Sequence, residues 1–368
     1  MPITNKVKFA NYEKTTESET TSATWVAQGT ILDSNLLAAN NEYLLVSWVN
    51  CISPGSNEGA TKLAFADGTT IIGSDQQRHD TNDSGICVSH IGQFIAPDPP
   101  QDIQVYRKRL YNGGHAEKTE LGQGFVIDLS YSGASGGLVS GTDFSSHADT
   151  SVRGGLSNGD TFHTHTVTEP GTNLIFAAAK VLDSVDAVLV GMYVNDVLVA
   201  SGSHYTQDTQ DEKTVVFAGT YEMGSSQTIK LKSLDTDTTV AKYSYSFSLN
   251  LGNGPANSGA KEVTNWSDLG GSGTWGSSTL DGNNDSSFVV AMGRQKVEST
   301  HSGRMASISL KNNTANEWLI FKDRPSGDFN PRYFPNTNSA DDRGQYETSV
   351  IVGVSTVGTG DSIEMVTV

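Results

Sequence analysis

The sequence predicts an all-β protein built from three tandem antiparallel β-sandwich or jelly-roll modules. Short runs rich in Val, Ile, Tyr and Phe recur between clusters of turn residues, for example at residues 43–49, 125–129, 187–194 and 243–249. This spacing is typical of antiparallel strands in sandwiches and barrels. Long apolar stripes with a helical period are missing from the sequence, which argues against an α/β enzyme with helices between its strands.

A repeated pattern predicts the three modules. Each copy is a strand-like run with a glycine, a tight connection, and a second run that alternates apolar and polar residues. The repeated glycines, Gly92, Gly219 and Gly353, lie about 130 residues apart, an interval that indicates tandem globular modules because solenoid repeats are shorter. A hairpin precedes each copy, and its turn is Asp67-Gly68 in the first and Asn195-Asp196 in the second. Both turns suit a two-residue connection.

Two Gly- and Ser-rich stretches, residues 131–160 and 252–259, place the module boundaries. We therefore expect module 1 at residues 1–131, module 2 with its linker at 132–252, and module 3 at 253–368. Module 3 reaches Val368 without the final strand that its siblings have. Because an open sheet edge is a liability, we expect the Lys6–Phe9 segment or a neighbouring copy to complete its sheet.

Charge and hydropathy exclude several classes of partner. The chain has 24 Lys and Arg against 41 Asp and Glu, a net charge of −17, spread over all three modules. Nucleic acids and anionic lipid surfaces need a concentrated basic face, so neither is an expected partner. No apolar run approaches the ~20 residues that span a bilayer, and no secretory signal opens the chain. Cys51 and Cys87 could form one bridge, but unpaired core thiols are the favoured interpretation.

No residue pattern predicts catalysis. Gly133-Ala-Ser135-Gly-Gly137 matches the Gly-x-Ser-x-Gly motif of hydrolases, but it lies in a flexible linker without the strand before it and the helix after it that would expose the serine. Arg107-Lys108-Arg109 is the single basic cluster and is interpreted as a solvated strand end. We expect a protein that is not an enzyme.

Two patterns are candidate metal ligands. His163 and His165 lie two apart in a strand-like stretch, so both imidazoles share a face and could reach one transition metal. Asp281, Asn283 and Asp285 place side-chain oxygens at alternate positions, as at the start of a calcium loop. The remaining EF-hand positions do not match, so the expectation is a looser Ca²⁺ site. Exposed strand histidines and an ordinary Asn/Asp turn are the alternatives.

Two tryptophans are candidate contacts for sugars. Trp266 and Trp275 lie among Gly and Ser residues, where an aromatic ring is expected to be exposed. Trp48 and Trp318 lie inside strand-like runs and are expected in the core. The exposed pair would provide a stacking platform for a glycan.

Module 2 resembles the jelly roll of the tumour necrosis factor-like class, on the strand pattern of residues 186–251. The stretch around His163-Thr-His165 resembles the His-x-His stretches of trimeric phage fibres and spikes, where such pairs bind iron on the three-fold axis. Together these features resemble the surface proteins of tailed bacteriophages, namely head decoration proteins, head fibres and tail fibres. The resemblance implies a homotrimer in the virion, made in the host cytoplasm, in contact with major capsid or tail proteins.

Two other functions stay open. A bacterial surface adhesin or lectin would bind cell-surface glycans through exposed aromatic residues. A polysaccharide-cleaving β-enzyme would need two carboxylates that face each other in a cleft.

Overall fold

The computed structural model confirms an all-β protein. It describes residues 7–53, 58–79, 85–111, 114–133, 136–182, 187–205, 212–235, 239–251, 263–268, 273–297, 308–312, 314, 317–318 and 345–367. Within these ranges the elements are β-strands, apart from one turn of 3-10 helix at Ser34–Leu36. No helix in the described part of the chain has the length and apolar character needed to cross a bilayer.

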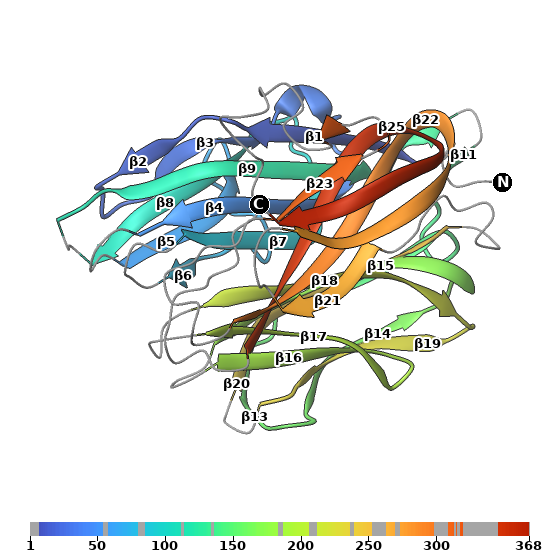
Figure 1. Ribbon diagram of the computed structural model, residues 1–368. Helices are drawn as coiled ribbons and strands as arrows, with labels where there is room; N and C mark the ends of the chain where they lie inside the picture. The colour runs from blue at the N-terminus through green and yellow to red at the C-terminus, as the bar shows by residue number, and fades with distance from the viewer. Residues whose placement is uncertain are drawn as a thin grey trace.

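Module 1 consists of two facing antiparallel sheets (Figure 1). The inner sheet has the order β1-β9-β4-β7, with β2 paired to β9, and the outer sheet has the order β3-β8-β5-β6. The strands are β1 (Lys8–Lys14), β2 (Ser18–Thr20), β3 (Val26–Leu32), β4 (Glu42–Ile52), β5 (Glu58–Phe65), β6 (Gln77–His79), β7 (Gly85–Ile95), β8 (Ile103–Tyr111) and β9 (Glu117–Asp128).

Module 2 repeats this arrangement. Its inner sheet has the order β12-β20-β15-β18, with β13 paired to β20, and its outer sheet has the order β14-β19-β16-β17. The short β10 (Ser132–Gly133) and β11 (Gly136–Gly137) pair with each other ahead of it. The other strands are β12 (Phe144–Asp149), β13 (Arg153–Leu156), β14 (Thr161–Val167), β15 (Gly171–Leu182), β16 (Ala187–Val194), β17 (Val197–Tyr205), β18 (Lys213–Met223), β19 (Gln227–Ser233) and β20 (Thr239–Asn250).

The strand order identifies both modules as jelly rolls. When the strands of each module are counted in chain order, the two modules have the same partners at every position. Two facing sheets with this order of strands form the jelly roll found in viral capsid and lectin domains. The shared topology explains the sequence repeat, because Gly92 on β7 and Gly219 on β18 occupy equivalent strands.

The connection inside the repeat differs from the prediction. The two strands of each repeat unit belong to opposite sheets, since β7 and β18 lie in the inner sheets while β8 and β19 lie in the outer ones. The expectation that the tight connection joins two paired strands within each repeat copy is therefore wrong. A sandwich requires such crossings because successive strands must cover both faces of one core. The hairpin expected at Asn195-Asp196 is confirmed, with φ of 50° and 62° at the two turn residues and Val194 paired to Val197.

The third region forms one described sheet of order β21-β22-β25-β23-β24. Its strands are β21 (Val263–Asp268), β22 (Gly273–Val297), β23 (Ile308–Asn312), β24 (Glu317–Trp318) and β25 (Gln345–Thr367). The tight connection expected after Gly353 in the third copy of the repeat is wrong, because β25 continues through it and pairs with β22 on both sides of it. The Lys6–Phe9 segment does not complete this sheet. Its described part enters β1, which pairs with β9 of module 1.

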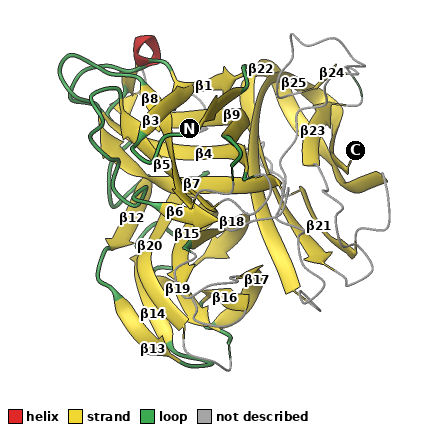
Figure 2. Cartoon of the chain, turned by 90° about the vertical axis from the view of Figure 1, so that its left-hand side faces the viewer, coloured by secondary structure: helices red, strands yellow, loops and turns green. Residues whose placement is uncertain are grey.

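The inner sheets are buried on both faces. Every residue from Tyr43 to Cys51 in β4 is buried, as is every residue from Thr172 to Val181 in β15. One core fills module 1 between its two sheets. A second, larger core joins the far face of the module 1 inner sheet to module 2 and to Met292 and Val350 of the third region. Figures 1 and 2 show the third-region strands β22 and β25 running alongside both modules.

Candidate functional site

The two predicted histidines lie inside module 2. His163 and His165 are on β14, which is at an edge of the outer sheet and pairs with β19. Their side chains share the inward face of the strand, as the spacing predicted, and are only 2% and 3% exposed. They contact serine hydroxyls on β20 and β12 of the facing inner sheet. The site therefore bridges the two sheets at one side of the jelly roll.

Three hydrogen bonds, one of them to the carboxylate of Glu169, fix the direction of donation around His165. Ser145 donates to Glu169 Oε2 at 2.9 Å, so its oxygen must accept from His165 Nε2 at 3.0 Å. With a proton on Nε2, the neutral ring accepts at Nδ1, and Ser246 donates to that atom at 2.9 Å. Ser246 has then used its only proton.

The same count of protons fixes the direction of donation around His163. Because the Ser246 oxygen can only accept, His163 Nε2 donates to it at 2.7 Å. His163 Nδ1 is then the acceptor for the hydroxyl of Ser244 at 3.0 Å. Both histidines are thus neutral Nε2–H tautomers. Every donor in this serine–histidine chain points in one direction, toward Glu169.

Burial keeps these rings neutral. Loss of hydration lowers the pKa of His163 to about 3, with smaller contributions from His147 and His165. The same cause, with His147 as a secondary one, lowers the pKa of His165 to about 4. His147 is exposed, and its ring centroid lies 5.2 Å from that of His163. Neutral rings whose nitrogens are all bonded to hydroxyls stabilise the packing of the two sheets.

The arrangement does not fit the axial metal site that the sequence predicted. A metal on a three-fold axis needs imidazole nitrogens at the protein surface, whereas all four nitrogens of His163 and His165 contact internal serines. Metal binding would break the serine–histidine chain. Within the described residues, no group of three or more His, Cys, Asp or Glu side chains is placed to hold a metal ion.

The other predicted site residues lie largely outside the described side chains. The backbones of Trp266 and Trp275 belong to β21 and β22, but their side chains are outside the described part. The same holds for the candidate calcium ligands Asp281, Asn283 and Asp285 in β22. The register there is irregular, because Asp281 pairs with Thr359 and Asp285 with Val357. Ser135 lies outside the described residues.

Neither Cys51 nor Cys87 forms a disulfide, as favoured from the sequence. Cys51 is buried, and burial raises the pKa of its thiol. Its Sγ atom lies 3.6 Å from the hydroxyl of Thr61. A buried thiol of raised pKa is a poor nucleophile, so Cys51 is a core residue.

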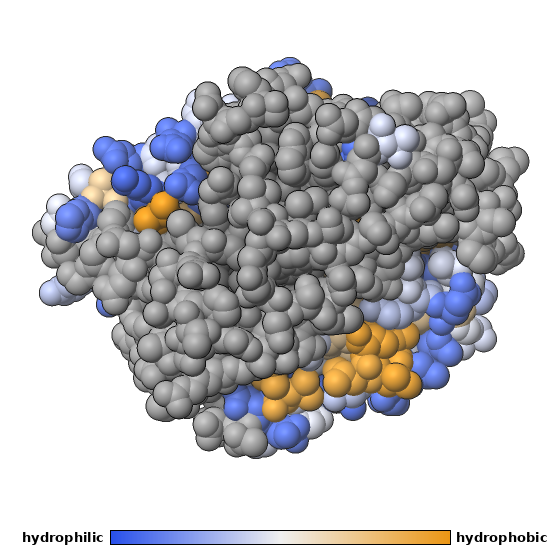
Figure 3. Space-filling model, viewed as in Figure 1, coloured by the Kyte–Doolittle hydropathy of each residue, from blue (hydrophilic) through white to orange (hydrophobic). Residues whose placement is uncertain are grey.

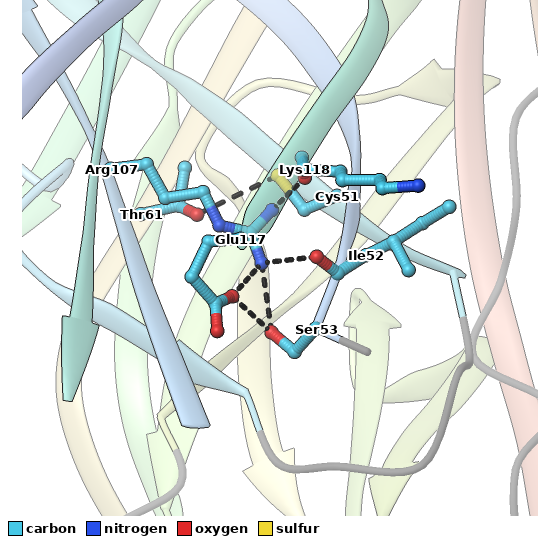
Figure 4. A network of polar contacts seen from close by, with 7 residues as sticks. All are labelled: Cys51, Ile52, Ser53, Thr61, Arg107, Glu117 and Lys118. Atoms are coloured by element: carbon cyan, nitrogen blue, oxygen red, sulfur yellow. Dashed lines mark hydrogen bonds and ion pairs between the residues drawn. The ribbon is translucent and has the colours of Figure 1, made fainter. Parts of the chain in front are cut away.

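The basic cluster at residues 107–109 is not a solvated strand end. Arg107 is fully buried and forms an ion pair with Glu117, also fully buried, at 2.5 Å (Figure 4). The guanidinium also donates to Ser53 Oγ and to two backbone carbonyls. This network ties β8, β9 and the end of β4 together inside module 1. Lys108, by strand alternation, lies on the opposite, outer face.

A second buried cation joins the modules. Lys180 on β15 is 0% exposed and pairs with Asp75 of module 1 at 2.5 Å and with Glu212 of module 2 at 2.8 Å. His90 on β7 lies near this group, and burial lowers its pKa to about 4. These contacts hold the two jelly rolls against each other. No local sequence motif indicates them.

One outer sheet carries an exposed apolar patch. Tyr193, Leu198 and Leu234 meet above Gly191, where an added Cβ would lie 2.9 Å from a carbon of each side chain. Leu198 is 47% exposed, and Tyr193 and Leu234 are half-buried. We call these three side chains the apolar patch. Figure 3 shows an orange area at the lower side of the molecule, over the sheet that contains β16 and β17.

The other outer sheet carries aromatic rings with lysines above them. Lys62 Nζ lies 5.1 Å from the ring centroid of Trp25 and 5.6 Å from that of Tyr106. Lys108 Nζ lies 4.6 Å from the Trp25 centroid. All four side chains are half-buried on the outer face of the β3-β8-β5-β6 sheet. We call them the Trp25 cluster.

Comparisons with known proteins add little to this geometry. No protein-family model and no curated protein matches the chain. Among solved structures, the insecticidal delta-endotoxin Cry8Ea1 of Bacillus thuringiensis is 8% identical with a TM-score of 0.23, over 53% of this chain and 42% of that one. The tandem CBM22 domains of Paenibacillus barcinonensis Xyn10C are 10% identical with a TM-score of 0.20, over 68% of this chain and 94% of that one. A chain of Sulfolobus Turreted Icosahedral Virus is 10% identical with a TM-score of 0.26, over 66% of this chain and 91% of that one. The jelly-roll assignment rests on strand order instead.

Proposed function

We propose that this chain is a non-enzymatic structural protein of a virion surface, a head decoration protein, head fibre or tail fibre of a tailed bacteriophage. It assembles as a homotrimer and contacts major capsid or tail proteins. The observation that carries the proposal is the apolar patch on the outer face of module 2. The jelly-roll fold supports it, because capsid proteins share this fold.

The apolar patch has the character of a contact surface. The β14-β19-β16-β17 sheet packs its inner face on the module core, so its outer side chains do not contribute to that core. Contiguous exposed apolar side chains mark protein–protein contacts more often than isolated ones do. Asp196, Lys230 and Lys232 form ion pairs beside the patch. A polar rim around an apolar centre is the usual anatomy of an interface.

Light scattering coupled to size exclusion tests this assembly. We expect the purified chain to have the mass of a trimer at micromolar concentration. Leu198→Asp should shift it to a monomer, because a carboxylate buried in an apolar contact costs several kcal/mol. Val152→Asp is the matched control, since Val152 is 66% exposed outside the patch. A monomeric wild-type chain, or a trimer that tolerates Leu198→Asp, would contradict the proposal.

A second candidate function is glycan binding at a cell surface. The Trp25 cluster favours it, because a half-buried aromatic ring with cations beside it on an outer sheet face is suited to contact a sugar. Lectins also use the jelly-roll fold, so the fold supports both candidates and the two outer surfaces separate them. The assembly proposal and the glycan proposal are independent, because they use different modules.

A further inference from the structure

The Trp25 cluster holds two cations against aromatic rings without an opposing acid. Lys62 and Lys108 both lie over the indole of Trp25, so their ammonium groups converge on one ring. Among the residues that the structure describes, neither lysine forms an ion pair with a carboxylate. This is unusual in a chain with 41 acidic residues and 24 basic ones.

The fold holds Lys62 in this position. Its ammonium donates to Thr70 Oγ1 at 3.0 Å and to the Gly68 carbonyl at 3.4 Å, in the turn that follows β5. Lys62 also pairs across the sheet with Tyr106, whose hydroxyl donates to the Ala66 carbonyl at 3.1 Å. Both side chains are therefore oriented before any ligand arrives, which reduces the entropy lost on binding.

The electrostatics of the Trp25 cluster favour an anion. Burial and the nearby charge of Lys108 lower the pKa of Lys62, so the ammonium of Lys62 is destabilised by its surroundings. An anion placed between the two lysines would relieve their repulsion and replace lost hydration with charge-assisted hydrogen bonds. The rings of Trp25 and Tyr106 add an apolar surface beside that position.

We propose that the Trp25 cluster is a binding site for an anionic saccharide, one that carries a carboxylate or sulfate group on a sugar ring. The anion lies between the ammonium groups of Lys62 and Lys108, and the ring rests against Trp25 and Tyr106. This inference rests on the glycan-binding candidate and not on the trimer.

Module 2 provides a matched control on its own outer sheet. Lys232 Nζ lies 4.4 Å from the ring centroid of Tyr193, a contact of the same kind as that of Lys62 with Tyr106. Lys232 and its neighbour Lys230, however, share the carboxylate of Asp196 at 3.8 and 2.7 Å. A lysine that already has an acidic partner gains less from an added anion. Binding at Lys62 but not at Lys232 would separate the proposed site from general attraction to surface lysines.

Isothermal titration calorimetry on the full chain tests the proposal. The probes are a heparin hexasaccharide, a hexa-galacturonate and neutral maltohexaose. We expect one or both anionic probes to bind and the neutral probe not to bind. Lys62→Gln and Lys108→Gln should each weaken binding at least about tenfold, since a hydrogen bond to a charged group is worth roughly 1.5–3 kcal/mol. Lys62→Arg should retain binding, and Lys232→Gln should leave it unchanged.

The outcomes separate the ligand source from the site. Binding of heparin alone identifies sulfate as the required anion, and binding of both probes identifies any anionic sugar. Binding that Lys62→Gln and Lys108→Gln leave intact, or that Lys232→Gln weakens equally, overturns the proposal. Preference for maltohexaose overturns the anionic class but leaves glycan binding by the chain standing. Circular dichroism confirms folding of each variant, and retained binding by Lys62→Arg excludes a purely structural effect.

Discussion

Acidification should destabilise the folded chain through three buried histidines. His163 and His165 belong to the serine–histidine chain of module 2, and His90 lies at the contact between the modules. Burial lowers their pKa values to about 3, 4 and 4, from an ordinary value of 6.5. As the pH falls, these histidines therefore bind protons in the unfolded chain and not in the folded chain. The stability that these groups contribute is fully present above about pH 6.5 and falls as the pH drops toward the folded values.

The magnitude follows from proton linkage. At about pH 5, an unfolded histidine is almost fully protonated and each buried one is neutral, which lowers the free energy of unfolding by about 2 kcal/mol per residue. The three histidines together give about 6 kcal/mol between about pH 7.5 and pH 5. Ordinary carboxylates stay ionised over most of this interval, so histidines dominate the change.

Urea unfolding followed by circular dichroism at several pH values measures this change. We expect the free energy of unfolding to fall steeply below about pH 6.5. His163→Asn should remove about a third of the slope, since one of three titrations is lost. Val152→Ala is the control, because Val152 is exposed and does not titrate, so the slope should stay unchanged. A free energy of unfolding that stays constant down to about pH 5 would refute burial of neutral histidines.

Two further substitutions test the packing of the jelly rolls, both by urea unfolding. Glu117→Gln should lower the free energy of unfolding by about 3–5 kcal/mol, because it leaves the buried Arg107 guanidinium without its counter-charge. Arg153→Gln, at an exposed ion pair, should lower it by at most about 1 kcal/mol. Equal effects would contradict the buried pair. Asn195→Val should lower the free energy of unfolding by about 1–2 kcal/mol, because φ is 50° there. Asn195→Gly should change it little. An Asn195→Val variant as stable as the wild type would contradict the turn.

The fold was predictable because its signals are local. Alternation of apolar and polar residues marks a strand with one buried face, and Asn195-Asp196 marks a tight turn. Repetition of both signals predicted modules of one kind. The crossing from β7 to β8 was not predictable in the same way, because a connection within a sheet and one between two sheets use similar turn residues.

The buried polar groups carry a signal that alternation could have revealed. Ile103, Val105 and Arg107 share one face of β8, so Arg107 continues an inward-facing series. His163 and His165 likewise continue to the buried Val167 on β14. The sequence cannot give the partners, since Ser246 lies 83 residues from His163. The alternation of residues along a strand indicates that a polar side chain is buried. Its hydrogen-bond partner depends on how distant strands pack.

The division between inner and outer sheets determines where this protein can meet other molecules. Strands β4 and β15 are buried on both faces, whereas β8 and β19 alternate between core and surface. The inner sheets are therefore used for packing within the chain, and the outer sheet faces remain available for contact. One outer face presents the apolar patch and the other presents the Trp25 cluster. A change on one face leaves the other intact, so assembly and ligand binding can be altered separately by substitution.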